Sequence, residues 1–169
     1  MDVFACEVNF DGDSAFVKIS GYLDENSNLS TYELGPAKLV VMDLANLKLM
    51  NSKGILTWIL WLRSQVRPDV ERVFSFVNCP KPFIDQVNMV EGLIPAGSKI
   101  ESFSVPFICP DCETTVIRLY QAPADFTVET KEAPATWQIP EVKCPECGAT
   151  AEIDVIEVRY FKFLKSRQA

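Results

Sequence analysis

The stretch Leu39–Leu60 reads LVVMDLANLKLMNSKGILTWIL and contains the pattern of a strand, a turn and a helix. Its first part belongs to Lys38–Leu44, a nearly continuous apolar run that is typical of a buried strand. From Ser52 onward, apolar residues recur at the 3.6-residue spacing of a helix, which we expect to end at Arg67 because Pro68 follows. The stretch therefore predicts a buried strand that turns directly into an amphipathic helix.

Further strands and a second helix are expected around this pair. An antiparallel hairpin comes first, because two alternating segments flank the turn sequence Asp-Gly-Asp-Ser at 11–14. A short helical turn is expected at Asp24–Leu29, and a second helix should begin at Pro82 and end near Gly92. Strands and helices thus alternate, which predicts an α/β fold with helices packed on a mixed sheet. The expected strands besides Lys38–Leu44 are Phe4–Phe10, Ala15–Ser20, Arg72–Asn78 and Ile100–Val105.

The C-terminal third contains two near-identical units, Ile108-Cys-Pro-Asp-Cys-Glu and Lys143-Cys-Pro-Glu-Cys-Gly. A CxxC turn directs two sulfurs to a common centre, and two such turns supply the four thiolates of a tetrahedral zinc site. The residue after the second cysteine is often glycine because the backbone there needs a positive φ, and Gly148 fits this preference whereas Glu113 does not. The predicted metal ligands are Cys109, Cys112, Cys144 and Cys147.

Three interpretations of this four-cysteine site stay open. A closed all-cysteine site is typical of one structural zinc ion. Rubredoxin-like iron has the same ligands and transfers electrons, and two CxxC pairs also suit thiol–disulfide chemistry. Because no coordination position is left open, metal-assisted hydrolysis is disfavoured. The other two cysteines, Cys6 and Cys79, are expected to be buried packing residues.

The spacing between the two cysteine pairs is unusual for a zinc ribbon. It holds 31 residues, against the roughly 15–20 that are typical. Thr114–Tyr120 and Ala149–Phe163 are rich in β-branched and aromatic residues, whereas Gln121–Pro140 contains several prolines and reads as a loop or as extra strands. We therefore expect an α/β domain of residues 1–104 and a small all-β zinc-ribbon module of residues 105–169.

Charge and composition limit the classes of function. The chain of 169 residues has a net charge of −7, which disfavours nucleic acid and anionic membranes as partners. It contains no histidine, so Ser-His and Cys-His catalysis and histidine metal ligation are excluded. The N-terminus lacks the pattern of a signal peptide, and the longest apolar run, Ile55–Leu62, is too short to cross a bilayer. We therefore expect a cytoplasmic protein that is not an enzyme.

Leu39–Leu60, together with Val17–Asp24, resembles the core of the anti-sigma-factor antagonist (STAS) family, and the resemblance covers roughly residues 3–103. In that family an Asp-Ser-Ser-Gly-like motif opens the helix. The resemblance implies a non-enzymatic regulator that other proteins bind, in which a partner kinase phosphorylates the serine that matches Ser52. A phosphate there would lie at a helix N-terminus, which favours negative charge. The matching residues here are Asn51, Ser52, Lys53 and Gly54.

The motif also has a simpler interpretation, because Asn51 or Ser52 could act only as the helix N-cap. Asn51 replaces the aspartate of the family and Lys53 its second small residue. Trp61 falls at the edge of the apolar stripe, so its ring is either part of the core or an anchor for a partner. Asn51, Lys53 and Trp61 are therefore the candidate partner contacts around Ser52.

The sequence thus predicts a bacterial-type cytoplasmic adaptor, with a STAS-like domain and a structural zinc ribbon, whose partner is a serine kinase or another signalling protein. Phosphorylation at Ser52 would switch its binding. The alternative is a nucleic-acid-binding zinc ribbon coupled to a sensory α/β domain. The mixed basic and aromatic stretch Arg159–Arg167 suits stacking on single-stranded nucleic acid, although a last strand of the ribbon explains it as well.

Overall fold

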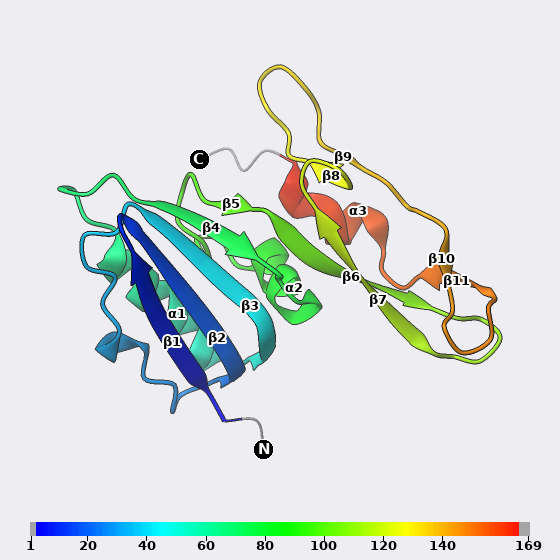
Figure 1. The fold of residues 1–169 in the computed structure, drawn as a ribbon, viewed down its shortest axis with the longest axis horizontal. Coiled ribbons are helices and arrows are strands. Elements are labelled where there is room, and N and C mark those ends of the chain that lie inside the picture. The colour runs from blue at the N-terminus through cyan, green and yellow to red at the C-terminus, as the bar shows by residue number, and fades with distance from the viewer. Residues whose placement is uncertain (1–2, 166–169) are drawn as a thin grey trace. The chain divides into compact units, whose positions relative to one another are not determined.

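A computed structural model describes residues 3–165, and the chain divides into two compact units between Glu101 and Ser102 (Figure 1). The expected strand Ile100–Val105 is two strands, β5 (Lys99–Ile100) and β6 (Ser102–Ile108), which belong to different sheets. The division therefore falls slightly earlier in the chain than the predicted boundary. None of the helices within residues 3–165 has the length and apolar character needed to cross a bilayer.

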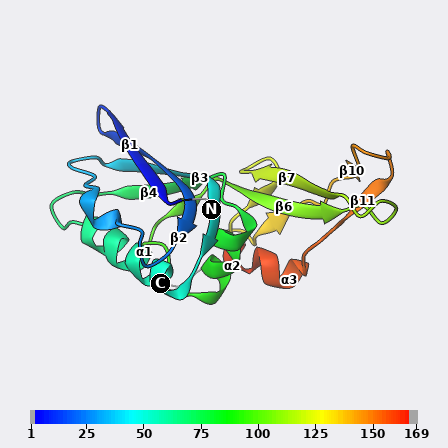
Figure 2. The same cartoon turned by 90° about the horizontal axis from the view of Figure 1, so that it is seen from below.

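Unit 1 contains a five-stranded sheet of order β1-β2-β3-β4-β5. The first two strands form the predicted antiparallel hairpin, and the other neighbours are parallel. The helices α1 (Ser52–Gln65) and α2 (Lys81–Met89) lie on the same face of this sheet (Figure 2). The mixed α/β class is thus confirmed. The strands that precede β5 are β1 (Ala5–Asp11), β2 (Ser14–Leu23), β3 (Leu39–Met50) and β4 (Val73–Val77).

The core of unit 1 lies between the sheet and the two helices. Alternate residues of β3 are fully buried, whereas Val41 and Asp43 on the other face are half-exposed, so β3 is buried on one face only. From α1, Trp58 packs against the rings of Phe76 and Phe83, with ring centroids 6.2 and 5.7 Å away. Each of these aromatic side chains is removed from water, which stabilises the unit by a few kcal/mol per ring, about 1.5–3 for a large apolar side chain.

Several boundaries in unit 1 differ from those predicted. The short helical turn is a 3-10 helix at Leu29–Thr31, because Asp24 and Ser27 form a side-chain-bonded turn in the segment where helix was expected. The C-cap of α2 is Val90, and Gly92 lies just beyond it with a positive φ of 76°. The first helix ends at Gln65, shortly before the proline that excludes further helix.

Unit 2 is built on a four-stranded sheet of order β10-β11-β6-β7, but it is not all-β as predicted. After the last strand the chain forms a short helix, α3 (Glu157–Tyr160), and a 3-10 helix, η2 (Phe161–Leu164). The insertion forms a small separate hairpin, so the extra-strand alternative is the correct one. The remaining strands are β7 (Thr115–Gln121), β8 (Phe126–Thr127), β9 (Thr136–Trp137), β10 (Val142–Lys143) and β11 (Thr150–Ile153).

An aromatic cluster around Phe103 explains why the C-terminal segment is helical. Helical spacing turns Tyr160, Phe161 and Phe163 towards that ring, with centroids 6.2, 5.9 and 5.0 Å from it. All three side chains are buried, so they are not available to stack on nucleic acid. They also lie in helical segments, so the alternative prediction of a last ribbon strand is wrong for them. Arg167, at the end of the predicted basic stretch, lies outside the described residues.

Candidate functional site

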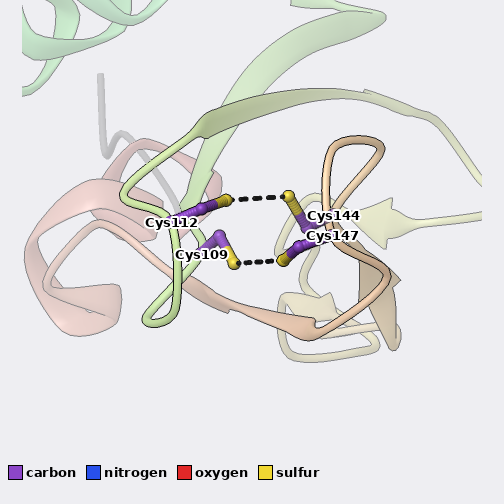
Figure 3. Close-up of side chains that lie close together, drawn as sticks. All are labelled: Cys109, Cys112, Cys144 and Cys147. Carbon is purple, nitrogen blue, oxygen red and sulfur yellow. Dashed lines mark hydrogen bonds between the residues drawn. The ribbon is translucent and has the colours of Figure 1, made fainter.

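The four predicted cysteine ligands lie together in unit 2. One pair occupies the loop between β6 and β7, the other the loop between β10 and β11, and all four Sγ atoms lie within 4.8 Å of one another. The closest contacts cross between the loops: Cys109 to Cys147 at 3.4 Å and Cys112 to Cys144 at 3.5 Å (Figure 3). A tetrahedral ion with metal–sulfur bonds of about 2.3 Å needs sulfur–sulfur distances of about 3.8 Å. The cluster could therefore hold one metal ion.

The two loops have equivalent backbone hydrogen bonds. In the first, the N–H of Cys109 donates to Thr114 and the N–H of Glu113 donates back to Cys109, both at 2.9 Å. The second loop repeats these two bonds at 2.8 and 2.9 Å, from Cys144 to Ala149 and from Gly148 to Cys144. The residue after the second cysteine has a positive φ in both, 59° at Glu113 and 77° at Gly148. Local backbone geometry thus aims each sulfur pair inward, although only one loop has the expected glycine.

The thiols of the cluster differ in acidity and exposure. Hydrogen bonding to Thr114, through its side chain and its backbone, lowers the pKa of the exposed Cys112 to about 6. At Cys147 the backbone of Ala149 lowers the pKa, but contacts with the neighbouring sulfurs outweigh it and raise the pKa to about 12. Adjacent thiolates repel one another, so protons are shared unequally within the cluster. A bound cation would replace those protons and hold every sulfur as a thiolate.

The two remaining cysteines differ from the cluster, as expected. Cys6 and Cys79 are both buried in unit 1. Burial raises the pKa of the Cys6 thiol to about 12 and raises the pKa of Cys79 well above its usual value. These thiols therefore act as apolar packing groups rather than as ligands or nucleophiles.

The second candidate region is the N-terminus of α1. Asn51 is its N-cap, and the side-chain oxygen of Asn51 accepts a hydrogen bond of 2.8 Å from the N–H of Gly54. The amide nitrogen of Asn51 donates to the Glu25 carboxylate at 2.8 Å, which lowers the pKa of that carboxyl. Of the two N-cap candidates, Asn51 is therefore the residue that caps α1. This leaves Ser52 and Lys53 as exposed residues of the first helical turn, with their side chains outside the cap.

Gly54 shows why the helix starts so close to the sheet. A Cβ on this residue would lie 1.9 Å from the backbone oxygen of Leu23, at the end of β2, which is far inside contact distance. Only glycine lets the first turn of α1 approach the strand so closely. The backbone therefore fixes the position of the exposed Ser52 and Lys53 relative to the sheet of unit 1.

Trp61, a predicted partner contact, is part of the core. Its side chain is 4% exposed, its ring lies 6.2 Å from that of Trp58, and its indole N–H donates to the backbone oxygen of Tyr32 at 2.8 Å. The exposed apolar residues of α1 are instead Leu56 and Leu60, which are 57% and 56% exposed. The signal for them was present in the sequence, because they fall outside the apolar stripe that contains Trp58.

Comparison with known proteins adds no relative to these observations: no family model matches the chain, and no curated protein matches its sequence.

Proposed function

We propose that the protein is a non-enzymatic adaptor that binds a partner protein through the exposed side of α1, with Ser52 as a phosphorylation switch and unit 2 as a structural zinc ribbon. The observation that carries the proposal is the exposed apolar surface on the helix that Ser52 opens. Such a surface on an otherwise well-packed helix is a common feature of protein-binding sites.

This surface, called here the α1 stripe, has a charge pattern that would select a partner. Lys53, Leu56, Leu60 and Arg63 are all exposed, and spacings of three and four residues align them along one side of the helix. Two leucines thus lie between two cations. The partner that fits presents apolar side chains flanked by acidic ones.

Phosphorylation at Ser52 would alter one end of the α1 stripe. The serine is the first residue of α1, and its hydroxyl makes no hydrogen bond to any residue from 3 to 165. A phosphate would add about −1.5 to −2 charges there, beside Lys53 and the free N–H groups of the first turn. It would thereby neutralise the cationic end of the stripe and weaken the attraction of an acidic partner.

The proposed relationship to the STAS family rests on topology as well as on the motif. An initial antiparallel hairpin, three parallel strand pairs and two helices on one face form a mixed sheet with helices, the class of fold that the resemblance implies. The polar residues at 51–53, followed by Gly54, lie at the junction of strand and helix where the family has its motif. These agreements support a regulatory, protein-binding role.

The proposed metal is one structural zinc ion. All four donors are cysteine sulfurs, the set that zinc and rubredoxin-like iron share. Elemental analysis of protein purified without added metal tests the assignment. We expect about one zinc per chain and no visible absorption. Stoichiometric iron with a red colour would instead assign the site as an electron-transfer centre.

The binding proposal is tested by retention of partners from native lysate on wild-type protein, Ser52→Ala, Ser52→Asp and a double variant, Leu56→Ser with Leu60→Ser. We expect the double variant to lose the partner, Ser52→Asp to retain less of it and Ser52→Ala to resemble wild type. The matched controls are Ser30→Asp, an exposed serine of unit 1, and Met89→Ser, an exposed apolar residue of α2. Equal retention by all variants would exclude the α1 stripe as the partner site.

A further inference from the structure

Strand β7 forms one edge of the four-stranded sheet in unit 2, and it carries exposed apolar side chains on one face of that sheet. Seven consecutive residue pairs join β7 to β6, without a bulge, and β7 has no other neighbour in the four-stranded sheet. Ile117 is 59% exposed and Leu119 is 37% exposed, and Thr115 is exposed on the same face. An edge strand of this length and character is a template for pairing with another strand.

Pro106 reveals which backbone groups of β7 face the open edge. Pro106 lies opposite Ile117, and because proline has no N–H the two cannot form a hydrogen-bonded pair. Accordingly, the oxygen of Pro106 points away from β7 and accepts a hydrogen bond of 2.9 Å from the N–H of Asp154. In an antiparallel pair, every second residue directs its backbone groups away from the neighbouring strand. The N–H and C=O of Thr115, Ile117 and Leu119 therefore point away from β6, towards the open edge.

Two further hydrogen bonds support this assignment. Gln121 comes two residues after Leu119, so its backbone groups also face the open edge. Its N–H donates to the Asp125 carboxylate at 3.0 Å, and its C=O accepts from the N–H of Asp125 at 2.9 Å. Asp125 therefore closes the C-terminal end of the edge. Among residues 3–165, no backbone hydrogen bond closes the outward groups of Thr115, Ile117 and Leu119.

The other long edge strand of the protein is protected, and β7 is not. In unit 1, the edge strand β1 carries the exposed carboxylates Glu7 and Asp11 on one face, and charged side chains on an edge strand disfavour its pairing with another strand. The edge strands β5 and β10 are two residues long. In contrast, β7 has the sequence TVIRLYQ, with neither proline nor lysine, and its one charge, Arg118, lies on the other face and is bridged to Asp125 at 3.4 Å.

We propose that two copies of this chain pair antiparallel through β7, with the two-fold axis at Ile117. In this register Ile117 meets itself, and Thr115 pairs with Leu119 of the second copy, so every outward group of the open edge finds a partner. The alternative register, centred on Arg118, places two arginines opposite each other and leaves Thr115 opposite Gln121, whose groups are occupied by Asp125. Hydrogen bonding and charge therefore both select the axis at Ile117. The inference is independent of the α1 stripe.

The test is sedimentation velocity of the full-length, metal-loaded chain over a wide concentration range. We expect a concentration-dependent dimer for wild type and monomers for Ile117→Lys and Ile117→Glu, because each variant places like charges across the axis. The dissociation constant should rise about tenfold or more. Mixing the two variants should restore a heterodimer, because the introduced lysine then faces the introduced glutamate.

Two controls separate the pairing from a loss of folding. Ile139→Lys changes another exposed isoleucine of unit 2 and should leave the dimer intact. Leu119→Pro removes only an outward N–H, which an edge strand tolerates, and should weaken the dimer without loss of metal. A dimer that Ile117→Lys does not weaken, or a mixture that stays monomeric, would overturn the proposal. A wild-type monomer would do the same, and if that monomer bound an extended peptide, the edge would be assigned to a different partner.

Discussion

The two units stabilise their sheets by different means. Unit 1 covers one face of its sheet with two helices and fills the space between with aliphatic side chains and a cluster of rings. In unit 2 the rings gather around Phe103, while the two cysteine loops are almost entirely exposed apart from Cys109 and Cys144. The difference leads us to expect that the cysteine loops, which bury little apolar surface, need a metal ion bound by the four sulfurs in order to fold.

Removing the metal ligands should have the largest effect. In Cys144→Ser with Cys147→Ser we expect loss of stoichiometric metal and of hydrogen-exchange protection in the two cysteine loops, with protection of β3 and α1 unchanged. Structural zinc contributes about 10–16 kcal/mol in zinc-finger peptides, which sets the scale. Cys79→Ala is the control, because that buried thiol lies in unit 1. Unchanged metal content in the double variant would show that the ligand assignment is wrong.

Core truncations should separate the two units. Phe103 lies within about 5–6 Å of five other rings of unit 2, and Phe76 packs against Trp58 and Phe83 in unit 1. Each change to alanine should cost about 3–5 kcal/mol. Hydrogen exchange should localise the loss from Phe103→Ala to unit 2 and that from Phe76→Ala to unit 1. If each variant destabilised both units equally, the separate cores inferred here would be one cooperative core.

Gly54→Ala should destabilise unit 1 by about 1–3 kcal/mol, although alanine is the better helix former. The added methyl group meets the backbone oxygen of Leu23, which cannot rotate away as a side chain could. Chemical denaturation measures the effect, with Leu60→Ala as the control because Leu60 is exposed on the same helix. An increase in stability for Gly54→Ala would mean that α1 can move away from β2 at little cost.

The parts that sequence predicted best depend on local pattern. Two CxxC turns predict the four cysteines that lie together in unit 2, and the apolar periodicity that begins at Ser52 predicts α1. The aromatic residues of Arg159–Arg167 suit a last strand of the ribbon by sequence, because tyrosine and phenylalanine favour strands, but contact with Phe103 favours helix at Glu157–Leu164. Likewise, β5 and β6 are separated by the single residue Glu101, and only their pairing partners show that they belong to different sheets.

Residues whose role depends on distant backbone could not be predicted. The sequence places Arg72 only at the start of a strand, yet its guanidinium donates to the carbonyl oxygens of Gly35, Ala37 and Gln65 at 2.5 to 2.8 Å. It thereby joins the chain before β3 to the end of α1. The burial of Trp61 also depends on tertiary structure, because its hydrogen bond is with Tyr32, far away in the sequence.

The smallest expected effects compare the two cysteine loops. Gly148 and Glu113 occupy equivalent positions with positive φ, where a side chain is strained. Gly148→Ala should therefore cost about 1 kcal/mol, whereas Glu113→Gly should be stabilising by less than that, because relief of strain is partly offset by the greater entropy of glycine in the unfolded chain. Thermal unfolding and competition with a chelator measure both variants in metal-loaded protein. Changes in stability of opposite sign would establish that the backbone of Glu113 is strained in the first loop. The shared geometry of the two loops would then result from bringing the four sulfurs together around one centre. Destabilisation by both changes would instead show that Glu113 makes a favourable contribution through its side chain that outweighs the strain of its backbone.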